Sequence, residues 1–260
     1  MQYSRFSVSK LSAYLIAGVL SLSAPLAYAD GVSELKAALS KLQGQTNLKA
    51  QLEIKSTERK SEGKNLADAV GQANLGLESN QYGFHLSYSK ETIAQMDQEE
   101  RSKEADPKKK TPTLKAITSI NNSSLRQMIS ASAQLSRAID NANFKSEKAD
   151  TYNGKPARLL SFDLSIDKLD PSERESIKKY DGTLEVWIAA DGTPLASKMR
   201  QHKSIRAMLV ISFEEKTETE QVYSVVGDHL VILRKDSRQQ GEGMGEKGEK
   251  STVTTLQVLG

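Results

Sequence analysis

The sequence predicts an α+β fold that is mainly β: a curved antiparallel sheet, in the form of a half-open β-barrel, covered by two amphipathic helices. Three observations favour this fold class. Apolar and polar residues alternate over most of the 260-residue chain, as in half-buried strands. Turn signals such as Asn153-Gly154 and Asp191-Gly192 separate these runs, as in antiparallel hairpins. Two stretches have helical spacing instead, and a curved sheet needs such elements to cover its apolar face.

The first part of the chain is expected to form one helix and three strands. Apolar residues recur at helical spacing before a glycine, at Val32, Leu35, Leu39, Leu42 and Gly44. Alternation then predicts strands over residues 48–55, 69–77 and 82–88. Residues 90–113 carry mixed charge with few apolar residues, so we expect a charged, solvated excursion whose acidic part is helical.

The second part is expected to form one more long helix and then a meander of strands. The capping pattern at Ser124 and an apolar stripe predict a helix over 124–139. Asp170-Pro171 begins a short helix. Strands are predicted at 144–152, 160–166, 184–188, 195–202, 205–213, 222–226, 229–234 and 252–259. Between the last two, the glycine-rich segment 237–251 is interpreted as a flexible loop.

Residues 1–29 are interpreted as a cleavable signal peptide. Arg5 and Lys10 give a basic start, Leu11–Leu22 an apolar stretch of suitable length, and Ala27-Tyr28-Ala29 a small-residue cleavage site. We therefore expect cleavage after Ala29, a periplasmic protein, and a single domain over residues 30–260. The chain has no cysteine, so a lipid anchor, disulfides and thiolate metal sites are not expected.

The charge balance argues against a nucleic-acid partner. The chain has 36 basic and 33 acidic residues, and two of the basic ones, Arg5 and Lys10, lie in the predicted signal peptide. Nucleic-acid binding needs a clustered basic excess, which this sequence lacks. After residue 29, no stretch approaches the ~20 apolar residues of a membrane-spanning helix, so a spanning protein is not predicted.

Catalysis, a metal site and a cofactor are not predicted either. The three histidines fall on the polar side of three different strands, without the paired spacing of metal ligands: His85, His202 and His229. Gly243-x-Gly245-x-x-Gly248 matches the dinucleotide pattern in letters, but a strand follows it where a helix is required. Carboxylate pairs such as Glu99–Glu100 and Glu214–Glu215 lie in charged runs. Only clustering of His85 or His202 with carboxylates would favour a hydrolase.

Two segments carry a resemblance to a known family. One is the helix with Leu35, Leu39 and Leu42-Gln43-Gly44 that leads into an alternating strand; the other is the strand, Asp-Gly turn and Pro-Leu return of residues 184–195. Both are similar to the periplasmic lipoprotein-carrier superfamily (LolA/LolB-like). Its members fold as an unclosed antiparallel barrel capped by helices, and they hold acyl chains in the cavity between sheet and helices. The resemblance implies a lipid or lipidated protein as partner, in outer-membrane biogenesis.

The expected function is therefore reversible binding of acyl chains in an apolar cavity. Alternatively, the same side chains fill a core, and the protein is an envelope protein–protein interaction or stress-sensing module that uses its outer face and residues 90–113. The candidate lining residues share the apolar side of the strands and the central helix: Leu75, Leu77, Phe84, Leu86, Leu125, Met128, Ile129, Phe162, Leu164, Val186, Ile188, Leu209 and Ile211.

Overall fold

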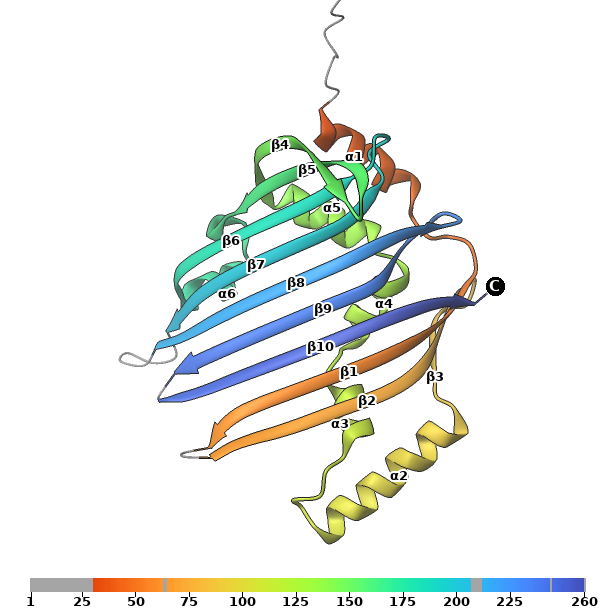
Figure 1. Ribbon diagram of the computed structural model, residues 1–260, viewed down its shortest axis with the longest axis vertical. Helices are drawn as coiled ribbons and strands as arrows, with labels where there is room; N and C mark the ends of the chain where they lie inside the picture. Colours follow the sequence, from red (N-terminus) through yellow and green to blue (C-terminus); the bar gives the residue numbers. More distant parts are fainter. Residues whose placement is uncertain (1–29, 63–64, 207–211, 244, 260) are drawn as a thin grey trace, which may run out of the picture.

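The computed structural model describes residues 30–62, 65–206, 212–243 and 245–259. They form one open antiparallel sheet with the strand order β3-β2-β1-β10-β9-β8-β7-β6-β5-β4 (Figure 1). The prediction of a mainly β chain with antiparallel pairing is confirmed. The ten strands are β1 Leu48–Glu62, β2 Asn65–Asn80, β3 Gly83–Ser87, β4 Ala142–Tyr152, β5 Lys155–Leu164, β6 Ile177–Ile188, β7 Pro194–Arg206, β8 Ser212–Val226, β9 His229–Gly243 and β10 Glu246–Leu259.

Six α-helices accompany the sheet in the described ranges: α1 Gly31–Lys41, α2 Lys90–Ala105, α3 Pro112–Thr118, α4 Asn122–Ile129, α5 Ser132–Asp140 and α6 Pro171–Ser176. The N-terminal helix, the acidic helix and the short helix after Asp170 are confirmed. The single helix expected over 124–139 is wrong, because the chain breaks at Ser130–Ala131 into α4 and α5. The N-cap is also different: it is Asn121 and not Ser124, and the Asn121 side chain accepts the Ser124 N–H at 2.8 Å.

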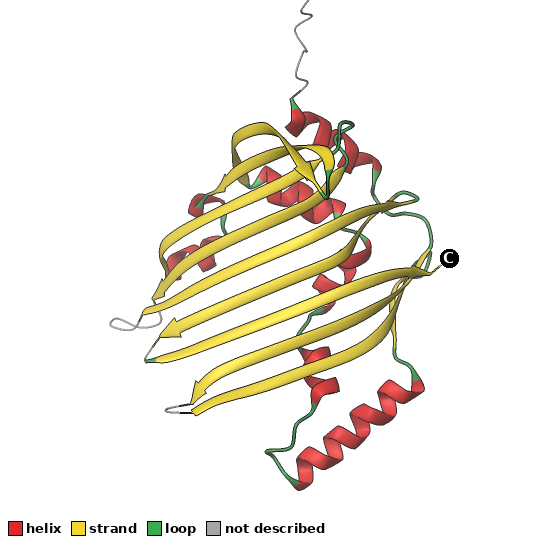
Figure 2. Cartoon of the chain, in the orientation of Figure 1, coloured by secondary structure: helices red, strands yellow, loops and turns green. Residues whose placement is uncertain are grey.

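The connectivity places α3, α4 and α5 on one face of the sheet. The first strand, β1, is the third from one edge of the sheet; the chain reaches that edge at β3 and re-enters at the opposite edge with β4. It then returns strand by strand until β10 pairs with β1, for example Leu256 with Leu52. The connection from β3 to β4 must cross the width of the sheet, and α3, α4 and α5 do so along one face (Figures 1 and 2). We call this face the inner face.

The inner face has an apolar half and a polar half. Ala50, Leu52 and Ile54 alternate along β1, and all three are fully buried in one core with residues of α1, α3, α4 and α5. Farther along the same strands, toward the β9–β10 turn, the inner positions become polar; on β10 they are Thr254, Thr252 and Lys250. Each strand therefore continues beyond the part that its apolar alternation reveals.

Two strand predictions are wrong. The segment 237–251, expected to be a flexible loop, belongs to β9 and β10, which pair as far as Gly243 with Glu246. Its backbone completes the ladder although its side chains are polar. The run 205–213, expected to be one strand, is divided, because Ile205 of β7 pairs with Phe213 of β8. By contrast, the Asn153-Gly154 hairpin is confirmed, and both residues have positive φ angles, 49° and 75°.

A polar clamp ties the segment between α1 and β1 to the turn between β8 and β9. The Gly44 N–H donates to the Asp228 carbonyl at 2.8 Å, and the Gln45 N–H donates to the Asp228 carboxylate at 2.7 Å. The Thr46 hydroxyl also donates to this carboxylate. The hydrogen bonds to the carboxylate, that from the Thr46 hydroxyl first and that from the Gln45 N–H next, lower the pKa of Asp228 to about 2, because they stabilise its charged form.

Acidification should weaken this clamp at an unusually low pH. The pKa of Asp228 is about 2 in the folded chain against an ordinary value of 3.8, so the unfolded chain takes up the proton first. The stabilisation is thus fully present above about pH 4 and is lost as the pH falls through about 2. Urea denaturation of the wild type and Asp228→Asn should show a stability difference near pH 5 that shrinks toward pH 2. A difference that stays constant over this range would contradict the assignment.

Candidate functional site

The predicted lining residues meet at the interface between the helices and the inner face. The fully buried members belong to the core cluster, with exposures of 4% or less: Leu75, Leu77, Leu125, Met128, Ile129, Phe162, Val186 and Ile188. Phe84, Leu86 and Leu164 are half-buried and pack against this cluster. Leu209 and Ile211 lie outside the described residues. The low exposures leave little room for a water-sized void beside the eight buried side chains.

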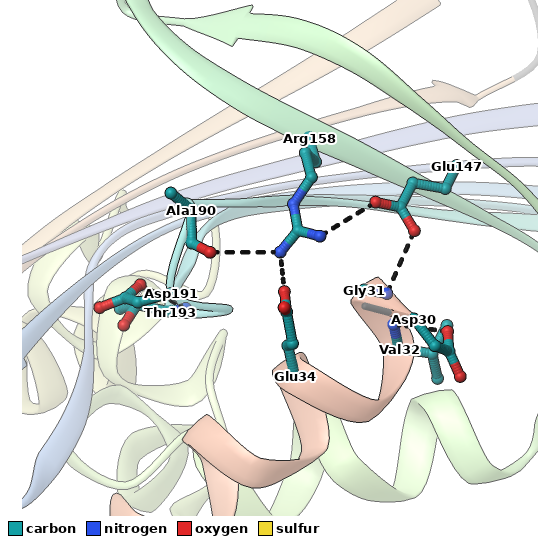
Figure 3. A network of polar contacts seen from close by, with 9 residues as sticks. All are labelled: Asp30, Gly31, Val32, Glu34, Glu147, Arg158, Ala190, Asp191 and Thr193. Atoms are coloured by element: carbon teal, nitrogen blue, oxygen red, sulfur yellow. Dashed lines mark hydrogen bonds and ion pairs between the residues drawn. The ribbon is translucent and has the colours of Figure 1, made fainter. Parts of the chain in front are cut away.

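Helix α1 is fixed to the sheet by a polar network (Figure 3). The Gly31 N–H, at the start of α1, donates to the Glu147 carboxylate of β4 at 3.1 Å. Arg158 of β5 donates to the other oxygen of Glu147 at 3.2 Å, and it also pairs with Glu34 of α1. A negative side chain suits a helix N-terminus, where the backbone N–H groups lack partners. These contacts hold the beginning of α1 in place against β4 and β5.

Helices α4 and α5 are attached differently. At the break between them, the Ala131 N–H donates to the Leu230 carbonyl at 2.9 Å, and His229 Nδ1 lies 2.9 Å from the Ile129 carbonyl. Away from the break, α5 meets the core through Leu135 and Ile139. An exposed ion pair from Asp140 of α5 to Lys36 of α1, at 2.6 Å, adds little. The α4–α5 segment is thus anchored at its break and packed by apolar contacts elsewhere.

Two small cavities lie where the apolar half of the inner face meets the polar half. The first, of about 160 Å³, is lined by Ser119, Ile120, Asn121, Ser124, Lys235, Ser237, Gln239, Lys250, Thr252 and Thr254. The second, of about 110 Å³, is lined by Gln134, Leu135, Ala138, Leu184, Ser197, Met199, Thr219, Gln221 and Lys235. Lys235 lines both cavities. Ligand pockets commonly measure about 300–1,000 Å³, so each of these spaces accommodates only a small group.

A wide recess, of about 1340 Å³, lies on the opposite, outer face of the sheet and has charged walls of both signs. There, His202 Nε2 lies 2.7 Å from a Glu214 carboxylate oxygen, so a histidine and a carboxylate do meet. Each side chain is about half exposed. Hydrogen bonds from Ser204 and His202 lower the pKa of Glu214, which keeps it charged. General acid–base chemistry favours groups whose pKa values are shifted toward neutrality, whereas the pKa of Glu214 is shifted away from it.

The other two histidines differ from each other. His85 is exposed, as expected, whereas His229 is buried at 1% exposure, so its placement on a polar surface is wrong. The reason is that β9 begins beneath the end of α4 and the segment after α1, where residues 229–232 are buried in succession. Across the described ranges, no group of three His, Asp or Glu side chains is arranged to hold a metal ion.

The charged excursion is better ordered than its composition indicates. Glu99 of α2 is buried at 7% exposure, and its two carboxylate oxygens accept the Thr113 and Leu114 N–H groups of α3, each at 2.9 Å. The interpretation of Glu99 as part of a solvated run is therefore wrong, because it caps the next helix. The other α2 side chains are exposed or half-buried. α2 projects from the end of the sheet (Figure 1).

Sequence reasoning missed Lys235, the residue shared by the two cavities. The apolar alternation of β9 ends near Arg234, so Lys235 was expected just beyond a strand, whereas β9 continues to Gly243. On β9, Lys235 pairs in register with Gln221 of β8 and Thr254 of β10, which places it on the inner face. The register of β8 and β9 shifts between Val222 and Tyr223, so Ile232, which pairs with Tyr223, and Lys235, which pairs with Gln221, share a face although they are three residues apart. Simple alternation along β9 therefore could not have found Lys235.

No family model, curated protein or solved structure matches this chain. The resemblance to lipoprotein carriers thus stays a prediction that depends on the two segments that carry it. In the described ranges, no helix combines the length and the apolar character needed to cross a bilayer.

Proposed function

We propose that this protein is a periplasmic binder or carrier of acyl chains, which it holds between the inner face of the sheet and the α4–α5 segment. One observation carries the proposal: α5 meets the sheet through apolar side chains and leaves a cavity beside Leu135, Ala138 and Leu184. Such an interface accepts apolar ligand groups in place of its own contacts. The same proposal includes export of the protein by a signal peptide over residues 1–29 and a half-barrel covered by helices.

The physical basis is the exchange of one buried apolar surface for another. Burial contributes about 25 cal/mol per Å² of apolar surface, or about 0.8 kcal/mol for each CH₂ group. The burial of an acyl chain therefore contributes enough free energy to offset the cost of displacing α5 from the part of the core that α5 covers. Because the second cavity measures about 110 Å³, a long chain enters only when α5 moves outward about the anchored break at Ser130–Ala131.

The alternative is an envelope interaction module, and α2 favours it. Most of this helix is exposed and polar, and Glu99 is its one fully buried side chain. A helix without an apolar face contributes little to a core, and the buried contact of α2 is the one that Glu99 makes with the first turn of α3. In this alternative, α2 contacts a partner protein and the core remains filled.

Filling the second cavity should block acyl binding. Ala138 is half-buried and lines this cavity, so Ala138→Phe places a ring where the chain would begin to enter. We expect the wild type to bind cis-parinaric acid, with a rise in the probe's fluorescence, and Ala138→Phe to bind it about tenfold more weakly, equivalent to about 1.4 kcal/mol.

Ala94→Phe is the matched control, because Ala94 is an exposed residue of α2. This variant should bind the probe like the wild type, and far-UV circular dichroism should show that both variants are folded. Absence of uptake by the wild type, or equal uptake by Ala138→Phe, would overturn the carrier proposal. Absence of uptake would also favour the interaction module.

A further inference from the structure

Lys235 is a cation held between the sheet and the helices. It is half-buried on the inner face of β9 and lines both cavities. Burial lowers the pKa of its ammonium group, because the charged form loses water. Over the part of the chain that the structure describes, its ammonium group makes no hydrogen bond and no ion pair. A partly desolvated cation without a protein partner is costly, and an anion bound beside it would offset this cost.

The surroundings of Lys235 favour an anion. No Asp or Glu is among the residues that line the two cavities, within the described ranges. A second lysine, Lys250, lies in the first cavity and donates to the Ser119 carbonyl at 3.3 Å. Its neighbour across the ladder is Glu58, which is already paired with Lys60 at 2.8 Å and with Lys115.

Neutral donors and a helix end add to this positive environment. Hydroxyl groups of Ser237, Thr252 and Thr254 line the first cavity with the lysines. The first turn of α4, with Asn121 and Ser124, lines it as well, and a helix N-terminus carries partial positive charge. Two cations, several hydroxyl donors and a helix end therefore surround one space without an opposing carboxylate.

We propose that Lys235 binds the anionic end of a small molecule, a carboxylate or phosphate group. Two sources share this chemistry: the head group of an acyl-chain amphiphile and a free inorganic anion. The geometry favours the head group. On the polar side of Lys235 lies the first cavity; on its other side, the second cavity has apolar walls at Leu135, Ala138 and Leu184. The head group of the amphiphile would lie among the lysines and hydroxyls of the first cavity, and its acyl chain would pass through the second cavity under α5.

This assignment of the head group depends on the proposed acyl binding, whereas the anion site itself does not. The test therefore compares three probes on the full chain: cis-parinaric acid, with a chain and a charge; dodecanol, with a chain alone, measured by displacement of a neutral fluorescent probe; and inorganic phosphate, measured by calorimetry. Lys235→Met removes the charge and keeps a long, apolar side chain. Lys216→Met is the matched control, because Lys216 is exposed on the outer face of the adjacent strand β8.

We expect Lys235→Met to bind cis-parinaric acid at least about tenfold more weakly, the loss expected for one charge-assisted hydrogen bond. Dodecanol binding should stay unchanged in Lys235→Met, and Lys216→Met should match the wild type for all probes. If Lys235→Met binds the acid as tightly as the wild type, the anion site is overturned while the carrier proposal stands. If neither long-chain probe binds the wild type, but phosphate binds and Lys235→Met abolishes this, the carrier proposal fails and Lys235 is a site for free anions. If no anionic probe binds the wild type, the site is overturned.

Discussion

Replacing Phe162 with alanine is expected to lower the free energy of unfolding by about 3–5 kcal/mol, the range for truncation of a large aromatic side chain in a packed core. Phe162 is 2% exposed on the inner side of β5, among the largest fully buried side chains of the described residues. Its neighbours Leu160 and Leu184 are also fully buried, so the surroundings cannot collapse easily into the space that the ring leaves. Chemical denaturation followed by circular dichroism measures this change.

Phe144→Ala is the natural comparison. The Phe144 ring contacts the Phe162 ring edge-on, with centroids 5.8 Å apart, but it is 51% exposed. Its loss should cost about 0.5–1.5 kcal/mol, the range for an aromatic pair. The pair of variants also separates the two alternatives that the sequence left open. A cost below about 1.5 kcal/mol for Phe162→Ala would mean that the inner face adjoins empty space and is not a filled core.

Alternation in the sequence predicted the inner face well, because burial on one side of a strand directly selects apolar residues at every second position. It identified Leu75, Phe162 and Val186 as members of one apolar surface, and the structure brings them into one core. The same reasoning could not show which strands are neighbours. β1 pairs with β10, from the other end of the chain, and no local pattern encodes a contact at this separation.

The polar part of the candidate site was beyond this reasoning. Lys235, Ser237 and Gln239 lie on strand positions, yet the apolar half of their strand ends before them. Backbone hydrogen bonding extends a sheet without apolar side chains once the neighbouring strands are in place. The break between α4 and α5 has a similar origin, because Ala131 donates to a carbonyl of β9, a tertiary contact that overrides helical periodicity.

Replacing His229 with phenylalanine is expected to have the second-largest effect. His229 Nδ1 lies 2.9 Å from the Ile129 carbonyl, and Nε2 lies 2.7 Å from the Thr46 carbonyl. Both ring nitrogens therefore lie within hydrogen-bonding distance of a backbone carbonyl. Through them, one buried side chain joins the end of α4, the start of β9 and the segment before β1. The ring thus supports the anchored break about which α5 would move.

Phenylalanine keeps a ring of similar size but removes both ring nitrogens, and a buried polar group left without its partner costs about 1–3 kcal/mol. The free energy of unfolding of His229→Phe should therefore fall well below that of the wild type. His85→Phe is the control, because it changes an exposed histidine, and its free energy of unfolding should stay within about 0.5 kcal/mol of the wild type. Hydrogen exchange gives the more specific readout. The Ala131 amide, bonded to Leu230 at 2.9 Å, should exchange faster in His229→Phe by a larger factor than amides in the middle of β7. Equal acceleration at both places, or equal stability of the two variants, would show that His229 does not hold the α4–α5 break.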